Sequence, residues 1–427
     1  MRFLYPARAE QLRLGWLAVL VNLIQDQRRS LDVLEADLRN IESRFSAWWE
    51  GSGLTEPPKG MVQQTRRRQT VRMLVAYGLY DEEQERLTDL GLLLQVIRPN
   101  VLKENKNPFV WTDGDRWIGL YLCVHVAGDV LISALRQWNA ATLGLKEAAD
   151  LLNSVLLQLS STTRDNEMAA RLHQQAGRVQ QDNAPKNLVY PYLEPLRELR
   201  FLTILRQGPK ERVYALTEAG LCLRARLLED QRSADEWLQE GLSRAFLEAD
   251  APGHSMHPAT ASDLGEALHR IPSQLTRASG QEVSLSTAVA YTQALLLRQK
   301  PGTWIDQALT VQLMEEITRR SGAGISFKRG LSVGETHISW SEPSLLEDPS
   351  IWGGRCPEVI LCSRALRLKW ILTALSGSRL TALRDSLPFP LSRALQNRQY
   401  WPSIPQRKKA QSRQSPRAPR PKKSPPQ

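Results

Sequence analysis

The stretch Ala184-Pro-Lys-Asn-Leu-Val-Tyr-Pro-Tyr-Leu-Glu-Pro-Leu-Arg-Glu-Leu-Arg-Phe-Leu202 continues through a turn at 207–209 into Arg212-Val-Tyr-Ala-Leu-Thr-Glu-Ala-Gly220. The runs 202–205 and 212–216 are rich in residues that favour strands, and Gln-Gly-Pro between them favours a turn. Thr217 lies where an N-cap is expected, and Gly220 three residues later permits close packing. The first part predicts a helix, because its apolar residues recur at helical spacing: Val189, Leu193, Leu196 and Leu199.

This order of helix, two-stranded wing and capped helix resembles the winged helix-turn-helix superfamily. The motif Leu216-Thr217-x-x-Gly220 after the wing is typical of that family. The resemblance covers 184–226, about a tenth of the chain, and implies nothing about catalysis. The alternative interpretation is an ordinary helix, hairpin and helix of some other domain.

A second copy of the pattern lies around 61–95. Val71, Leu74 and Val75 mark one helix face, and a short acidic turn at 81–85 follows. Leu87-Thr88-x-x-Gly91 then matches the later motif, so that the two threonines are 129 residues apart (217 − 88). The sequence therefore predicts two winged helices in one chain.

The predicted fold class is mainly α with small β-wings, that is α+β. Residues 1–100 are predicted to form the first winged-helix domain and 183–249 the second, with 101–182 as a helical connector. An α+β domain of unassigned family follows at 255–401, with helices near 261–269, 286–297 and 305–319 and a hairpin formed by 324–329 and 335–340. A short strand is expected at 359–362, and three short helices within 367–399 are a further hypothesis.

The C-terminal segment 402–427 is predicted to be disordered, because it contains seven prolines and little that can be buried. It also carries eight basic residues and no acidic one, which would attract nucleic acid without reading its sequence. The net charge of the chain is +11, so the remainder carries only +3 (11 − 8). Any DNA-binding surface on the folded body must therefore come from local clustering of cations.

The helix before the first predicted wing is the best candidate for contact with double-stranded DNA. Arginine can read guanine, glutamine can read adenine, and both can hold phosphate. A solvated basic face or a contact with a protein partner is the alternative. The candidate reading residues are Arg66, Arg67, Arg68, Gln69 and Arg72.

The second copy is less suited to DNA, because Glu194 and Glu198 accompany the basic residues of its helix. An acidic helix of this kind favours contact with protein. The candidate backbone contacts in this copy are Lys186 on the helix and Arg206, Lys210 and Arg212 on the wing.

Cysteine usage and the N-terminus predict a cytoplasmic protein without a membrane partner. The four cysteines form no Cys-x-x-Cys pair, and the apolar run 12–24 is interrupted by Arg13 and Asn22, unlike a signal peptide. The run 117–138 predicts a buried helix. No cofactor is expected, because phosphate-loop and dinucleotide fingerprints are absent from the sequence. No metal is expected either, since His254 and His257 lack further ligands nearby.

The leading hypothesis is a non-enzymatic DNA-binding protein of bacterial type. It would be the DNA-recognition subunit of a multi-protein system in antiviral defence, replication or regulation, with its C-terminal domain contacting a protein partner. One alternative is a winged-helix adaptor that binds proteins, as in chromosome-organising complexes. Another is a nuclease with an unrecognised site in 255–375, suggested by Asp348 and Glu358.

Overall fold

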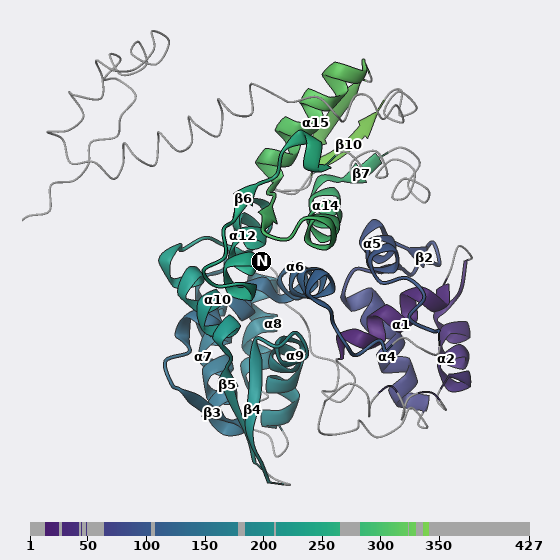
Figure 1. Cartoon of the computed structure of the whole chain (residues 1–427). Helices are drawn as coiled ribbons and strands as arrows, with labels where there is room; N and C mark the ends of the chain where they lie inside the picture. Colours follow the sequence, from purple (N-terminus) through teal and green to yellow (C-terminus); the bar gives the residue numbers. More distant parts are fainter. Residues whose placement is uncertain are drawn as a thin grey trace, which may run out of the picture. The chain divides into compact units, whose positions relative to one another are not determined.

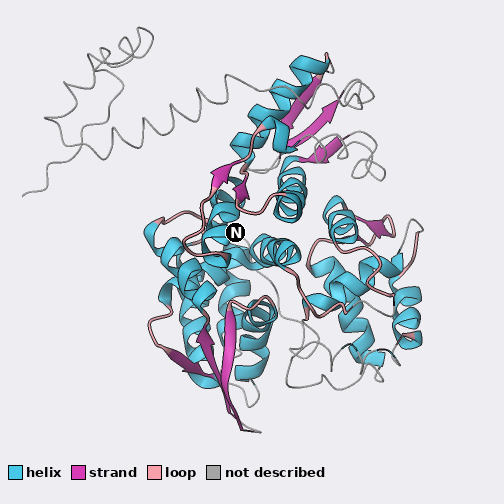
Figure 2. Ribbon diagram, viewed as in Figure 1, coloured by secondary structure: helices cyan, strands magenta, loops and turns pink. Residues whose placement is uncertain are grey.

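The computed structural model describes residues 13–24, 28–41, 44, 48, 64–103, 107–177, 184–208, 211–264, 282–322, 324–329 and 336–340. Within these ranges the chain is mainly helical and contains four small sheets of two or three strands (Figure 2). The predicted fold class is thereby confirmed. The strand expected at 359–362, the helices expected within 367–399 and the tail 402–427 lie outside the described residues.

The N-terminal part combines helices with a very short hairpin (Figure 1). Its first helix is apolar on all sides and almost wholly buried, as expected for a helix enclosed by others. The second is capped by the Ser30 hydroxyl, which accepts a hydrogen bond from the Val33 amide. The elements are α1 (Leu14–Ile24), α2 (Leu31–Asn40), α4 (Gln64–Ala76), β1 (Tyr80–Asp81), β2 (Arg86–Leu87) and α5 (Asp89–Ile97).

The central part is built around a three-stranded antiparallel sheet of order β3-β5-β4. Its middle strand β5 lies between the hairpin partner β4 and the short β3, which belongs to the segment predicted as a connector. The hairpin extends past the neighbouring helices (Figure 1). The elements are α6 (Asp113–Gln137), β3 (Thr142–Gly144), α7 (Leu145–Thr162), α8 (Asn166–Gly177), α9 (Ala184–Glu198), β4 (Leu202–Gly208), β5 (Glu211–Leu216) and α10 (Glu218–Glu229).

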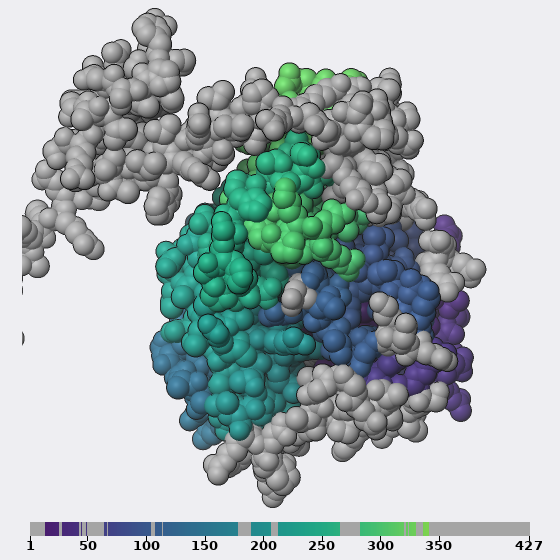
Figure 3. Space-filling view, viewed as in Figure 1, coloured from purple at the N-terminus to yellow at the C-terminus, as the bar shows by residue number. Residues whose placement is uncertain are grey.

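The long helix α6 supplies much of the core, as predicted for 117–138. Trp117 lies edge-on to Phe246 and tilted against Tyr121, and Phe246 also lies edge-on to Phe201. These rings are fully buried and join α6 to the start of β4 and to α12 (Leu242–Asp250). Figure 3 shows that the teal part of the chain forms one continuous surface on this face of the molecule.

The C-terminal described part contains another three-stranded antiparallel sheet, of order β7-β10-β9. The predicted hairpin is confirmed, as are the two helices that precede it. A parallel pair of two-residue strands, β6 and β8, lies beside them. The elements are α11 (Ala234–Glu236), a π-helical turn (Trp237–Gly241), β6 (His257–Pro258), β7 (Glu282–Ser284), α14 (Leu285–Gln299), β8 (Thr303–Trp304), α15 (Gln307–Ser321), β9 (Ile325–Arg329) and β10 (Thr336–Trp340).

The two helix–hairpin–helix segments share their backbone geometry in detail. We call α4-β1-β2-α5 the first hairpin motif and α9-β4-β5-α10 the second. In the first, the Thr88 hydroxyl donates to the carbonyl of Gly78 at 2.6 Å and accepts from the Gly91 amide at 3.2 Å. In the second, the Thr217 hydroxyl makes the same two bonds, at 2.7 and 3.1 Å. In each motif the threonine therefore caps the helix after the hairpin and also binds the turn that follows the helix before the hairpin.

Each motif also turns its chain at one left-handed residue and packs a glycine against the backbone. The left-handed residue is Gly78 in the first motif, with φ 63°, and Arg200 in the second, with φ 64°. A Cβ on Gly91 or on Gly220 would lie 2.1 Å from the carbonyl oxygen of the residue after that turn. The internal similarity predicted from Leu-Thr-x-x-Gly is thus a similarity of structure, with a longer hairpin in the second motif.

Candidate nucleic-acid interface

Helix α4 presents a basic face without acidic residues. Its apolar side packs into the core through Val71, Met73 and Leu74, which are almost fully buried. Arg68 and Arg72, four residues apart, are exposed on the same side of the helix, and Gln69 is half-buried. The arrangement places two predicted reading arginines where a nucleic acid can reach them.

Glu35 on α2 holds the N-terminal part of this face. Its carboxylate lies 3.1 Å from Nε of Arg68 and 3.9 Å from Arg67. The side chain of Arg67 is only 12 % exposed, whereas that of Arg68 is 59 % exposed. Arg67 is therefore part of the packing between α2 and α4. Arg68 pairs with the same carboxylate, but most of its side chain is exposed to solvent. Sequence reasoning missed Glu35, whose separation from α4 hides the pairing.

The acidic residues of α9 face the interior. Every residue from Pro191 to Glu198 is buried. Glu194 accepts a hydrogen bond from Tyr214 at 2.8 Å and forms ion pairs with three guanidinium groups, those of Arg13, Arg197 and Arg212. The helix of the second motif thus has no acidic outer face over this range, because its carboxylates hold the fold together.

The charge of Glu194 is stabilised by this cluster. Burial alone would raise the pKa of its carboxyl, but Arg13, Arg197 and the Tyr214 hydroxyl together hold the pKa below its ordinary value. Arg212 is also stacked over the ring of Tyr190, with its guanidinium carbon 4.5 Å from the centroid. The Arg212 side chain, predicted as a phosphate contact, therefore binds Glu194 and Tyr190 within the fold and is only 13 % exposed.

Glu198 joins α9 to the N-terminus of α1. It accepts hydrogen bonds from the amides of Leu14 and Gly15, at 2.9 and 2.8 Å, and from the Trp111 indole at 2.8 Å. A carboxylate at a helix N-terminus satisfies amides that have no partner within the helix. Burial nevertheless raises the pKa of Glu198 above its ordinary value, although Arg13 and these donors act in the opposite direction.

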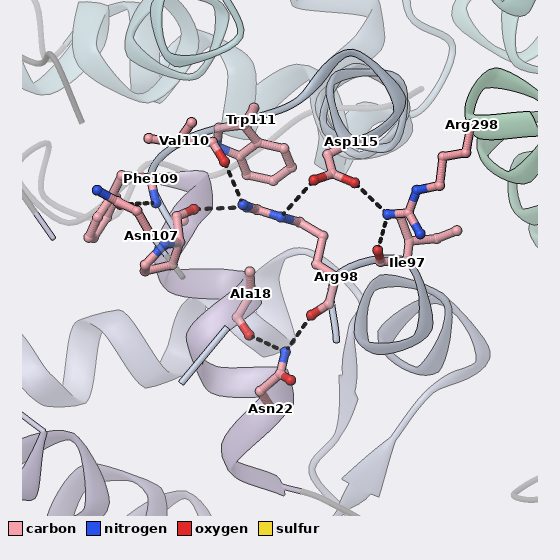
Figure 4. Close-up of polar contacts among 12 residues, drawn as sticks. Ala18, Asn22, Ile97, Arg98, Asn107, Phe109, Val110, Trp111, Asp115 and Arg298 are labelled. Atoms are coloured by element: carbon pink, nitrogen blue, oxygen red, sulfur yellow. Dashed lines mark hydrogen bonds and ion pairs between the residues drawn. The ribbon is translucent and has the colours of Figure 1, made fainter. Parts of the chain in front are cut away.

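A further buried network joins α5, α6 and α14 (Figure 4). Arg98 donates to the carbonyls of Pro108 and Val110, at 2.8 and 2.7 Å, and its guanidinium carbon lies 4.0 Å from the centroid of the Trp111 ring. Asp115 lies 3.5 Å from Arg98 and 2.6 Å from Arg298. Burial lowers the pKa of Arg98, while the Asp115 carboxylate acts in the opposite direction. Arg98, Asp115 and Arg298 bond to one another and to backbone carbonyls, so this network holds the three helices together and is not an open binding site.

The remaining predicted contacts lie where the structure describes no side chain. These are Arg66 on α4 and Lys186 on α9, at which only the backbone of the helix is described, together with Arg206 on β4 and Lys210 between the strands. Their roles stay predictions. Among the predicted residues, only Arg67, Arg68, Gln69 and Arg72 are described together, all on α4.

The described residues also bear on the expectations about a metal ion and about the long apolar helix. They contain no group of three or more His, Cys, Asp or Glu side chains able to hold a metal ion. Helix α6 is long and apolar enough to cross a membrane, and 78 % of its most apolar window is buried within the fold. Asp348 and Glu358, the carboxylates considered for a nuclease, lie outside the described residues.

Comparisons with protein-family models, with curated proteins and with solved structures found no match.

Proposed function

We propose that the two hairpin motifs are winged helices and that the chain is a DNA-binding protein whose principal contact is the exposed face of α4. The single observation that carries the proposal is the pair Arg68 and Arg72, exposed on a helix that has no acidic residue and directly precedes a hairpin. A helix in this place with cations facing outward suits insertion into the major groove.

The burial of α9 supports different roles for the two motifs. Its carboxylates bind Arg13, Arg197 and Arg212 inside the fold, so that the second motif supports the first through α1. In this proposal Arg68 and Arg72 meet the DNA, Gln69 lies beside them, and Arg67 positions α4 through Glu35. The basic residues of 402–427 add affinity that does not depend on sequence.

The adaptor function is the second candidate, and exposed leucines favour it. Leu221 and Leu228 on α10 are 53 % and 40 % exposed, and Leu205 on β4 is 62 % exposed. Positions seven residues apart lie on one side of a helix. A protein partner that covers α10 would explain this side of the second motif, whereas DNA would not.

The test is a salt titration of DNA binding by the full-length chain with its tail neutralised. Glutamine would replace the eight basic residues of 405–427, and fluorescence anisotropy would follow binding to a mixed-sequence duplex. We expect binding that weakens steeply with salt, because each phosphate contact contributes about 0.9 to the slope of log K against log salt. Substituting both Arg68 and Arg72 with alanine should lower that slope by about two.

The matched control removes the same charge elsewhere. Arg164, two residues before α8, and Arg171 within α8 are both exposed and would be replaced by alanine, and this variant should bind almost as the parent does. Absence of binding by the tail-neutral chain would reject the DNA-reading role of α4 and favour the adaptor. An equal loss in both double variants would show that net charge, and not the α4 face, governs binding.

A further inference from the structure

We call the sheet β3-β5-β4 the second sheet and the sheet β7-β10-β9 the third sheet. The two have the same topology, although no family resemblance was found for the third. In each, a three-residue strand leads directly into a helix, a later helix leads into a hairpin, and the last strand lies in the middle. The order is β3-β5-β4 in one and β7-β10-β9 in the other, with all neighbours antiparallel. We call β7-α14-α15-β9-β10 the third hairpin motif.

In the short strand and the helix that follows it, the similarity extends to individual positions at a constant offset of 140 residues. Leu143 in β3 and Val283 in β7 are the buried central residues of their strands, and each pairs with a buried residue of the middle strand, Tyr214 or Ile338. The next residue is the N-cap of the following helix in both cases. The helices then bury residues at the same relative positions: Ala148 and Ala288, Leu152 and Thr292, Leu156 and Leu296.

The outer face of the third sheet carries groups that suit phosphate. Lys328 lies opposite His337, and Ser326 lies opposite Ser339, with their hydroxyl oxygens 2.8 Å apart. The Lys328 side chain is 73 % exposed. Arg329, the last residue of β9, is also exposed, but its side chain lies on the opposite face of the sheet, so the two cations share the end of the strand and not one face. Lysine, arginine and serine are among the side chains that most often contact nucleic-acid phosphates.

One carboxylate limits this face. Glu282 on β7 lies 3.3 Å from the Lys328 ammonium and is itself 44 % exposed. An exposed ion pair of this kind contributes little stability. The Lys328 ammonium can therefore exchange this partner for a phosphate, and removing the carboxylate should favour that exchange.

The helices of the second and third motifs differ in accessibility. Helix α9 is buried from Pro191 to its end, whereas α15 exposes Gln312, Glu315 and Arg319 along its outer side. Glu315 and the Arg319–Glu316 pair make that side unsuited to reading bases. Contact by the third motif would therefore come from its hairpin, through the phosphate backbone, and would carry no sequence preference.

We propose that the third hairpin motif repeats the arrangement of β3, α7, α9, β4 and β5, and that Lys328 and Arg329 at the end of β9 contact the phosphate backbone of duplex DNA. The proposal rests on the proposed DNA-binding function, and it adds a second contact region far along the chain from α4. It assigns a role to part of the block 255–401, which the sequence left without a family.

The test compares the full-length chain with two variants in anisotropy titrations against a mixed-sequence duplex over a salt series. Replacing both Lys328 and Arg329 with alanine should lower the salt slope by about two and weaken binding at low salt. The substitution Glu282→Gln should act in the opposite direction and tighten binding several-fold. Arg164 and Arg171, replaced together, are the charge-matched control. Should the alanine variant fold poorly, glutamine at both positions removes the same charges.

The outcomes separate the two proposals. If the Lys328/Arg329 variant binds with an unchanged slope while the Arg68/Arg72 variant loses affinity, the third motif has no DNA contact and the α4 proposal survives. An equal decrease in the Arg164/Arg171 control would also overturn the inference. If the unmodified chain binds no duplex even at low salt, both proposals are overturned.

Discussion

The hydroxyl of Thr217 donates a hydrogen bond to the carbonyl of Arg200 across 2.7 Å, and Arg200 holds a left-handed backbone with φ 64°. Its counterpart in the first motif is Gly78, bound in the same way by Thr88 and with φ 63°. The two motifs thus use one turn with different residues. Only glycine adopts this conformation without a steric penalty, so Arg200 is held there by its surroundings.

The first prediction follows from this difference. The substitution Arg200→Gly should raise the free energy of unfolding by about 1 kcal/mol, because it removes the left-handed penalty of a residue with a Cβ. The reverse change, Gly78→Ala, should lower it by a similar amount, although open space surrounds a Cβ at that position. Urea denaturation followed by circular dichroism measures both. Equal and negligible changes would show that the turn imposes no strain.

The second prediction concerns the glycine after each threonine. A Cβ on Gly220 would lie 2.1 Å from the carbonyl oxygen of Phe201, and one on Gly91 equally close to that of Leu79. Backbone cannot move away as a flexible side chain can, so Gly220→Ala should destabilise by more than about 3 kcal/mol, at the upper end of the overpacking range. The control is Gly177→Ala at the end of α8, where a Cβ meets nothing within 4 Å. A tolerated Gly220→Ala would contradict the shared packing of the two motifs.

The local chemistry of these motifs explains why sequence reasoning found them. Thr217 and Gly220 lie three residues apart, and their capping bond depends on neighbours in the chain, so the pattern is readable without tertiary structure. The strand β3 was missed because three residues give little periodicity and its partner β5 is about 70 positions later. The third sheet was predicted as helices and a hairpin, but the pairing of β7 with β10 depends on long-range packing.

The candidate site was only partly predictable for a similar reason. The basic run on α4 is visible in the sequence, whereas the carboxylate of Glu35 reaches it from α2. Glu194 and Glu198 were expected to give an acidic surface. Their partners Arg13, Leu14 and Gly15 lie more than 180 positions away, and that distance conceals their burial.

The third prediction concerns the pH dependence of stability at Glu194. Its pKa in the folded chain is below the ordinary value, so its contribution is present above the unfolded pKa and is lost as pH falls through the folded pKa. At pH 7 the substitution Glu194→Gln should cost about 3–5 kcal/mol, because it leaves buried guanidinium groups without their carboxylate. The difference between variant and parent should narrow as pH falls below the ordinary carboxyl pKa.

Urea titrations at neutral and acidic pH measure this difference. Glu167→Gln is the matched control, since Glu167 pairs with Arg171 at an exposed site and should change stability by less than about 1 kcal/mol. A gap for Glu194→Gln that stays constant with pH would show that the carboxylate charge contributes nothing to the fold.

The last prediction distinguishes a DNA-contacting role of Arg68 from a structural role of Arg67 on α4. Arg68 is 59 % exposed and Arg67 only 12 %, although both lie beside Glu35. The substitution Arg68→Ala should weaken DNA binding by about 1–3 kcal/mol if the side chain reads a base, with little loss of stability. Arg67→Ala should instead lower the free energy of unfolding, because it removes buried side-chain contacts and leaves Glu35 with one cation fewer. Anisotropy titration and urea denaturation of both variants measure the two effects. If Arg67→Ala lost more DNA affinity than Arg68→Ala while staying fully stable, the outward face of α4 would not be the reading surface, because accessibility is the property that distinguishes these neighbouring arginines.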